Sequence, residues 1–169
     1  MESLQRAAAA LPKPEELLPH RAPFLLVDKV VELNEGVSAR AELRIRGDEF
    51  WCAAHFPGYP VMPGVLLVEA MAQVAAIAEG GLRGAGGTRQ AGPTGGPGGD
   101  VADAVRPLPL LAAVKNARFV AQARPGMNLT IEAQIGRRLG NFGTAACSVV
   151  ADGGSKVAQC EITFAMQQA

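Results

Sequence analysis

The chain has 169 residues, which is enough for one domain with a substantial buried core. Its 16 basic and 16 acidic residues balance, so no overall electrostatic field recruits a nucleic acid or an anionic membrane surface. An anionic partner therefore has to be met by a local patch. We expect a single domain over residues 1–169, with neither nucleic acid nor membrane among its partners.

The three cysteines, Cys52, Cys147 and Cys160, are an odd number at wide spacings, which is typical of neither a disulfide framework nor a zinc site. We interpret them as reduced thiols of a cytoplasmic protein and expect no metal. The alanine run at residues 7–10 is too short for a signal-peptide core. The most apolar window, residues 61–78, is interrupted by a proline, a glutamate and a glutamine, and predicts a buried helix rather than a membrane span.

The first third of the chain predicts a short helix and a hairpin. PKPEELL, at residues 12–18, indicates one or two helical turns with acids near the start. Two β-rich stretches follow at residues 24–33 and 37–46, separated by an Asn-Glu-Gly turn. The second alternates apolar and polar residues with the period of a half-buried strand, so we expect an antiparallel hairpin.

One long apolar helix is predicted over residues 63–82. Pro63 suits the first helical position, because the N–H that proline lacks would be unpaired there anyway. Gly80 and Gly81 are expected to mark the end of this helix.

A glycine- and proline-rich insertion follows at about residues 84–106, with eight glycines in the seventeen residues 84–100. Such a composition buries too little apolar surface to offset the entropy of ordering, so we expect a flexible loop. A phosphate-binding loop is disfavoured, because these glycines follow a helix rather than a strand.

Four more strands are predicted in the last third, separated by glycine-containing turns. They are LPLLAAVKNARFVAQ, NLTIEAQIGRRL, FGTAACSVVAD and KVAQCEITFAM, which we expect to form a meander. One long helix and about six strands joined mostly by short turns favour an α+β domain, with an antiparallel sheet packed on a central helix. A parallel sheet is disfavoured because helical crossovers are missing.

The stretch HFPGYPVMPGVLLVEA, residues 55–70, carries one of only two histidines and a carboxylate within the helix. Gly64 and Val65 present backbone N–H groups at the positive end of the helix dipole, where they can stabilise a developing oxyanion. Glu69 lies on a mainly apolar face, where an unpaired acid is unfavourable. With His55, these groups are the parts of an acid–base elimination site. The residue types alone also leave open a structural histidine and a solvent-facing glutamate.

HFPGYPVMPGVLLVEAMAQ, together with the upstream LPHRAPFLLVD, resembles the β-hydroxyacyl-acyl-carrier-protein dehydratases of the FabZ type. The similarity continues through PLLAAVKNARF and ARPGMNLTIEA. The resemblance implies a hot-dog fold, in which an antiparallel sheet wraps one long helix. It also implies an obligate homodimer, often assembled into a hexamer as a trimer of dimers, in which each active site uses the histidine of one chain and the glutamate of the other.

Carried over by position, the resemblance makes His55 the general base that removes the α-proton of a β-hydroxyacyl thioester. Glu69 would help expel the β-hydroxyl as water, and the Gly64 N–H, with that of Val65, would hold the thioester oxygen. The implied enzyme is a lyase of fatty acid or related acyl-chain biosynthesis. It would act on acyl groups carried by the phosphopantetheine of an acyl carrier protein, without a metal or a protein-bound cofactor.

The sequence departs from the family pattern at three positions. Ala54 stands where glycine is usual, and is expected to crowd the base. Ala113 and Lys115 stand where glycine and aspartate are common, and are expected to alter the acyl tunnel or its rim.

Other positions bear on specificity and partners. Leu110 and Leu111 lie near the place of an aromatic gate in some relatives. His20 and Arg21 match the upstream motif, and we expect them to have a structural role near the helix or the entrance. The basic residues that we expect to meet an acidic carrier are Arg118, Lys115 and Arg124.

Two alternatives remain open on the sequence. A hot-dog acyl thioesterase shares the fold, because function belongs to sites rather than to folds, and it would release a free thiol. A catalytically degenerate homologue would bind the acyl carrier without turnover.

We predict that deleting residues 84–100 leaves folding largely intact, because this composition contributes little to a core. The measurement is the thermal melt of the deletion variant followed by circular dichroism. A loss of the cooperative transition would show that the segment is structural.

Overall fold

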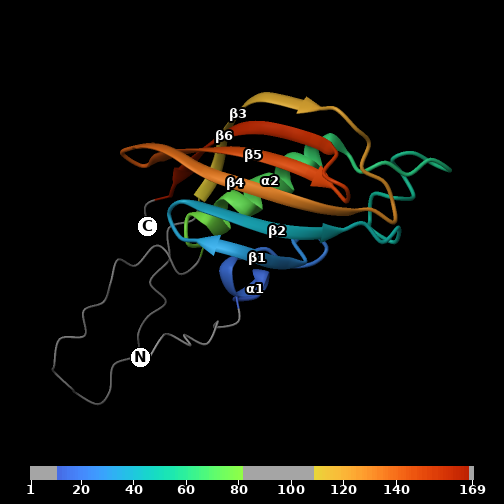
Figure 1. Cartoon of the computed structure of the whole chain (residues 1–169), viewed down its shortest axis with the longest axis horizontal. Helices are drawn as coiled ribbons and strands as arrows, with labels where there is room; N and C mark the ends of the chain where they lie inside the picture. Colours follow the sequence, from blue (N-terminus) through green and yellow to red (C-terminus); the bar gives the residue numbers. More distant parts are fainter. Residues whose placement is uncertain (1–10, 82–108, 168–169) are drawn as a thin grey trace, which may run out of the picture.

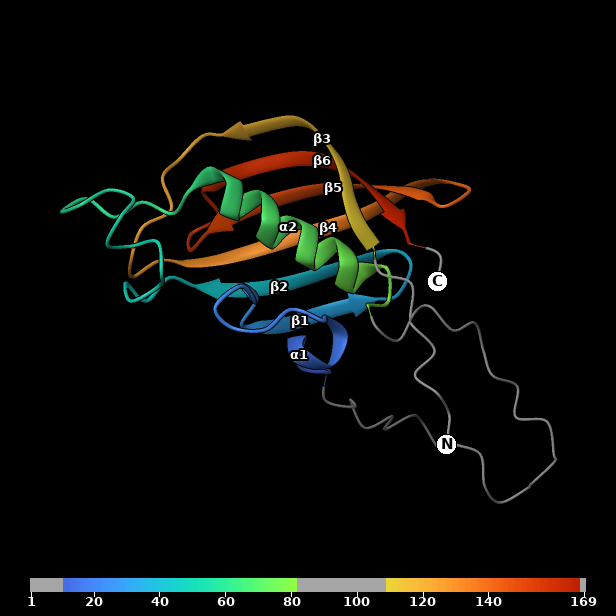
Figure 2. The ribbon, with the colours of Figure 1, turned by 180° about the vertical axis from the view of Figure 1, so that it is seen from behind.

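The computed structural model describes residues 11–81 and 109–167, in which a curved sheet wraps around one long helix (Figures 1 and 2). The glycine-rich insertion predicted at residues 84–106 lies outside these described residues. The elements in chain order are α1 (Pro14–Leu17), β1 (Lys29–Asn34), β2 (Ser38–Arg44), α2 (Gly64–Ala78), β3 (Pro109–Phe119), β4 (Asn128–Leu139), β5 (Phe142–Ala151) and β6 (Lys156–Met166).

All six strands form one sheet in the order β1-β2-β4-β5-β6-β3, and every neighbouring pair is antiparallel. Strands β4, β5 and β6 form the predicted meander. The prediction that β3 belongs to it is wrong, because β3 pairs with β6 at the far edge of the sheet. Alternation and turn residues define where a strand begins and ends, but the edge that it joins depends on long-range pairing.

The predicted first strand begins too early, because β1 starts at Lys29 and not at residue 24. Two of the residues before β1 form hydrogen bonds with a side chain of the long helix. The Leu26 N–H donates to Gln73 Oε1 at 3.0 Å, and the Phe24 carbonyl accepts from Gln73 Nε2 at 2.8 Å. A side-chain amide therefore replaces the strand partner that this apolar segment would otherwise need.

Helix α2 is shorter than predicted at both ends. Pro63 has φ −54° and ψ 133° and forms the N-cap, so the first helical residue is Gly64. At the other end, Gly80 and Gly81 have φ of 96° and 53°, and the Gly81 N–H returns to the Ala76 carbonyl at 2.8 Å. This left-handed termination suits glycine, and confirms that the two glycines end the helix.

The core lies between α2 and the inner face of the sheet. In β2 the burial alternates strictly, with Ala39, Ala41 and Leu43 facing inward. Nearly every residue of α2 from Ala70 to Ala78 is buried, because the sheet curls around this half of the helix (Figure 2). The α+β prediction with a central helix is confirmed, and the architecture is the hot-dog fold.

The three cysteines are buried free thiols. Cys147 and Cys160 are paired in register on β5 and β6, and their sulfur atoms lie 3.8 Å from the Met71 carbonyl oxygen and 3.7 Å from Met71 Sδ, respectively. The neighbouring Cys160 and burial raise the pKa of Cys147 far above its ordinary range, and burial with the nearby Glu49 raises the pKa of Cys52 to about 11. Such thiols pack as small apolar groups.

Within the described part of the chain, no helix combines the length and the apolar character needed to cross a membrane.

We predict that Leu129→Ala lowers the free energy of unfolding by about 2–5 kcal/mol, because this β4 side chain is 0% exposed and its loss leaves a cavity. Leu139→Ala is the matched control, since this leucine of the same strand is 83% exposed and its truncation should change stability by less than about 0.5 kcal/mol. Urea unfolding at one protein concentration measures both. Equal losses in the two variants would contradict the placement of the core.

Candidate active site

His55 lies on the connection between β2 and α2, where it is half-buried. Its Nδ1 is 2.8 Å from the Val61 carbonyl oxygen, which can only accept a hydrogen bond, so Nδ1 carries the proton. Backbone bonds fix the residue further, from the His55 N–H to the Trp51 carbonyl at 2.9 Å and from the Val61 N–H to the His55 carbonyl at 2.8 Å. A neutral ring held in this way keeps Nε2 as a basic lone pair.

The loop that carries His55 is attached to the segment between β3 and β4. The Arg124 guanidinium lies 3.7 Å from the centre of the Tyr59 ring, and the Tyr59 hydroxyl donates to Gln122 Oε1 at 3.2 Å. The Met62 N–H donates to the Ala123 carbonyl at 2.8 Å. A cation–π contact and two hydrogen bonds therefore hold the loop in place.

The N-terminus of α2 presents unused donors. The first amides of this turn with an acceptor are Leu66 and Leu67, both bonded to the Pro63 carbonyl, and no side chain caps the helix. Among the described residues, the N–H groups of Gly64 and Val65 have no partner. A β-carbon at position 64 would lie 3.0 Å from the ring of the exposed Phe119, so a larger residue would fit only if this ring moved aside.

Glu69 faces a pocket beside α2, and its carboxylate has two nitrogen neighbours at one oxygen. Gln73 Nε2 donates to Oε1 at 2.9 Å, and His20 Nε2 lies 3.4 Å from the same atom. The Glu69 side chain is 22% exposed, whereas Gln73 is 1% exposed. The carboxyl group is thus partly shielded and held by neighbours, which excludes a simple solvent-facing glutamate.

The pocket has a volume of about 220 Å³ and a mainly apolar wall. It is lined by Leu17, Leu18, Pro19, His20, Glu69, Ala72, Gln73, Ala76, Gly81, Pro109, Leu110 and Leu111. An apolar cavity with a few convergent polar groups is the usual form of a small-molecule site. Leu110 and Leu111 line this pocket, whereas Ala113 and Lys115 do not. The expected effect of Ala113 and Lys115 on an acyl tunnel or its rim stays a prediction.

A single chain does not bring His55 and Glu69 together. The partners of His55 are Val61, Trp51 and the stacked ring of Phe56, and it is not among the residues lining the Glu69 pocket. Ala54, next to the histidine, is exposed, and the expected crowding of the base stays a prediction.

Gln73 and the approach of His20 to Glu69 were not predicted as parts of the site. A signal for Gln73 was present, because a polar residue four positions after Glu69 on an apolar helix lies on the same face. The position of His20 had no such signal, since it depends on how the segment after α1 packs on α2.

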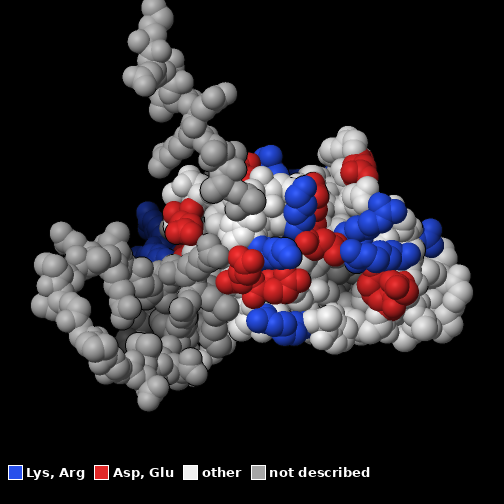
Figure 3. Space-filling model, turned by 90° about the horizontal axis from the view of Figure 1, so that it is seen from below, with Lys and Arg blue, Asp and Glu red and all other residues white. Residues whose placement is uncertain are grey.

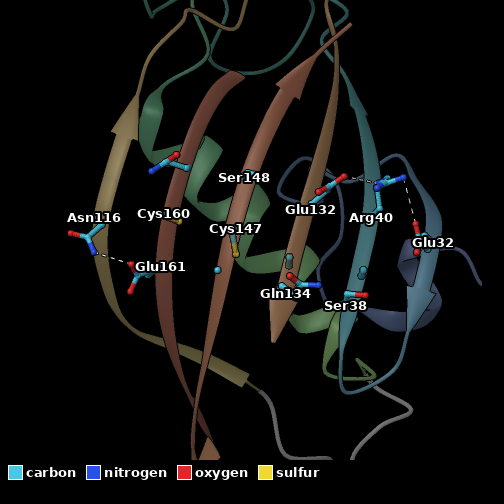
Figure 4. A pocket seen from close by; sticks show the side chains of 14 residues that line it. Glu32, Ser38, Arg40, Asn116, Glu132, Gln134, Cys147, Ser148, Cys160 and Glu161 are labelled. Carbon is cyan, nitrogen blue, oxygen red and sulfur yellow. Dashed lines mark hydrogen bonds and ion pairs between the residues drawn. The ribbon is translucent and has the colours of Figure 1, made fainter. Parts of the chain in front are cut away.

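A larger hollow lies on the outer face of the sheet, away from α2 (Figure 4). Its charged side chains have polar partners. Arg40 Nε lies 2.7 Å from Glu132 and Arg40 Nη1 lies 3.5 Å from Glu32, while the Asn116 amide donates to Glu161 at 2.9 Å. Neither His55 nor Glu69 lines this hollow. Positive and negative side chains are likewise interspersed on the face seen in Figure 3, so no single-sign patch forms there.

Comparison with known proteins identifies the family of this chain. The family model described as a FabA-like domain matches residues 18–161. The 3-hydroxyacyl-(acyl-carrier-protein) dehydratase FabZ of Staphylococcus carnosus (strain TM300) is 37% identical over 153 residues, which are 90% of this chain and 92% of that protein. The protein of the same name from Bacillus cereus (strain AH820) is 38% identical over 152 residues, again 90% and 92% of the two chains.

Among solved structures, the dehydratase heterocomplex ApeI:P from Xenorhabdus doucetiae matches with a TM-score of 0.66 at 15% identity, over 94% of this chain and 93% of that one. At this identity the likeness concerns the fold alone. The family match covers most of the sequence, including the loop of His55, the start of α2 and Glu69. The chain therefore belongs to the FabA-like family.

Proposed function

We propose that this protein is a β-hydroxyacyl-acyl-carrier-protein dehydratase, a lyase that forms the trans-2-enoyl thioester in fatty acid or related acyl-chain biosynthesis. The observation that carries the proposal is His55, whose Nδ1 proton is bound by the Val61 carbonyl so that Nε2 is available as a base. The names of the relatives at 37% and 38% identity support the substrate class.

The available groups match the requirements of the reaction. Nε2 of His55 takes the α-proton, and the electrons of that C–H bond pass toward the thioester carbonyl. The Gly64 and Val65 N–H groups stabilise the charge that develops on its oxygen. Glu69 gives a proton to the β-hydroxyl, the C–O bond breaks, water leaves and the double bond forms. Base, acid and oxyanion donors are all needed, because the α-carbon is a weak acid and hydroxide is a poor leaving group.

We infer that the working unit is a homodimer, because one protomer keeps His55 and Glu69 apart. The edge strand β3 supports this, since within the described ranges 11–81 and 109–167 its outer edge pairs with no strand, and it exposes Leu110, Leu111, Val114 and Phe119. Long apolar edges invite pairing with another strand. Val65, 75% exposed beside the helix end, adds to the apolar surface that a second copy would cover. Dimers of this kind can assemble further into a hexamer as a trimer of dimers.

In this proposal the acyl group arrives on the phosphopantetheine of an acyl carrier protein in the cytoplasm. Lys115 and Arg118 are exposed on β3 and are available to an acidic carrier. Arg124 packs on the Tyr59 ring, so a carrier that contacted Arg124 would dock next to the loop that holds His55.

We predict that His55→Ala and Glu69→Gln each lower the rate of dehydration by about 10²–10⁴-fold, the usual contribution of a general acid or base. The assay is the hydration of a short enoyl thioester, followed by loss of its conjugated absorbance, with thermal melts as the folding control. Release of free thiol by the native protein would instead favour a thioesterase. Binding of carrier-linked substrate without turnover would favour a degenerate homologue.

A second prediction concerns the shared site. Mixing unfolded His55→Ala and Glu69→Gln chains and refolding them should restore activity to about one quarter of the native value, because half of random dimers are mixed and each has one intact site of two. Each variant refolded alone is the control. No recovery, with dimers present by light scattering, would place the whole site within one chain.

The β3 edge can be tested by Val114→Asp, which should produce an inactive monomer by light scattering, because a charge would be buried in the dimer. The matched control is Val37→Asp, an exposed valine beside the β1–β2 turn. A monomer that still turned over substrate would overturn the dimer proposal.

A further inference from the structure

His20 lies beside the Glu69 carboxyl group. The reaction described so far gives it no role. It follows α1, lines the same pocket as Glu69, and brings Nε2 to 3.4 Å from Glu69 Oε1. Gln73 Nε2 reaches that same oxygen at 2.9 Å. Two nitrogen atoms therefore converge on one oxygen of the carboxyl group.

The orientation of the Gln73 amide is determined by its other bonds. Its Oε1 accepts from the Leu26 N–H at 3.0 Å, so this end has to be the carbonyl oxygen. Its Nε2 donates to the Phe24 carbonyl and to Glu69 Oε1. Glu69 Oε1 consequently acts as an acceptor toward Gln73.

The environment of His20 selects one arrangement of its proton. Among the described residues, Nδ1 is buried and has no hydrogen-bond partner, whereas Nε2 points to Glu69. A proton on Nδ1 would be a buried and unpaired donor, which is unfavourable. A ring protonated on Nε2 avoids that penalty and directs its N–H toward Glu69 Oε1, 3.4 Å away.

The segment of His20 is held firmly enough for this role. Arg21 Nη1 donates to the carbonyls of Leu18 at 2.8 Å and His20 at 2.7 Å, which fixes the backbone of the segment that lines the pocket. The Phe24 N–H returns to the Arg21 carbonyl at 2.9 Å, and the Phe24 ring stacks on His20 with centroids 6.5 Å apart. The imidazole is therefore oriented before any substrate binds.

We propose that His20 is a positioning residue that, together with Gln73, keeps Glu69 Oε1 as an acceptor, so that the acidic proton resides on Oε2. This inference rests on the proposed dehydratase function. Oε2 is then the atom that transfers its proton to the leaving hydroxyl, while the C–O bond breaks and water departs. Glu69 gains negative charge in that step, so the two donors on Oε1 bind the transition state more strongly than the ground state.

The test compares His20→Phe with His20→Gln in steady-state dehydration of a carrier-bound β-hydroxyacyl substrate. Phenylalanine keeps the aromatic contact with Phe24 but has no donor, and should lower kcat about tenfold with KM within about twofold, as for one hydrogen bond to a charged group. Glutamine offers an N–H at a reach similar to that of Nε2, and should retain most of kcat. Both should melt close to the native temperature.

An unchanged kcat in His20→Phe would overturn the inference, as would an equal loss in both variants when both melt normally. A rise in KM with kcat preserved would also overturn it, because it indicates only a pocket wall. If His20→Phe fails to fold, His20→Met serves as the variant without a donor. An inactive native protein would instead count against the proposed dehydratase function, so the two failures are distinguishable.

Discussion

The side chain of Gln73 lies in the apolar core and makes three hydrogen bonds there, to Leu26, Phe24 and Glu69. Burying an amide is tolerable only when its donors and acceptor are satisfied, and here they are. The same bonds hold the segment before β1 against α2 and orient the carboxyl group of Glu69. One residue thus links the packing of the core to the geometry of the pocket, and the placement of His20 depends on the segment that Gln73 secures.

The two ends of helix α2 differ in burial. Its C-terminal half contributes to the core, and its N-terminus is available to a substrate. From Ala70 to Ala78 the sheet encloses the helix, and small side chains allow the strands to approach it closely. At the other end Gly64 and Val65 remain accessible, and their N–H groups, at the positive end of the dipole, have no partner among the residues that the structure describes. A firmly anchored helix can present such donors without reorganising, which is the condition for electrostatic stabilisation of an oxyanion.

The edge strand β3 is the least buried part of the sheet, and this agrees with a site that is incomplete in one chain. Strands β2, β4 and β5 each have one buried and one exposed face, whereas β3 is exposed along almost its entire length. Its apolar residues therefore lack the contacts that their neighbours have. On the outer face of the sheet, the described residues Arg40, Glu132, Glu32 and Glu161 already have ionic or hydrogen-bonding partners.

Local patterns determined much of this protein. The alternation in β2, the apolar run of α2 and the two glycines at its end were readable from the sequence, because each reflects a short-range rule of backbone geometry or burial. The choice of His55, Glu69 and Gly64 as candidate site residues also came from one contiguous stretch. Only the tertiary structure decided that β3 joins β6, that the segment from residue 24 bonds to Gln73 instead of forming a strand, and that His20 approaches Glu69. These features join residues far apart in the chain, and no local propensity records which distant groups will meet.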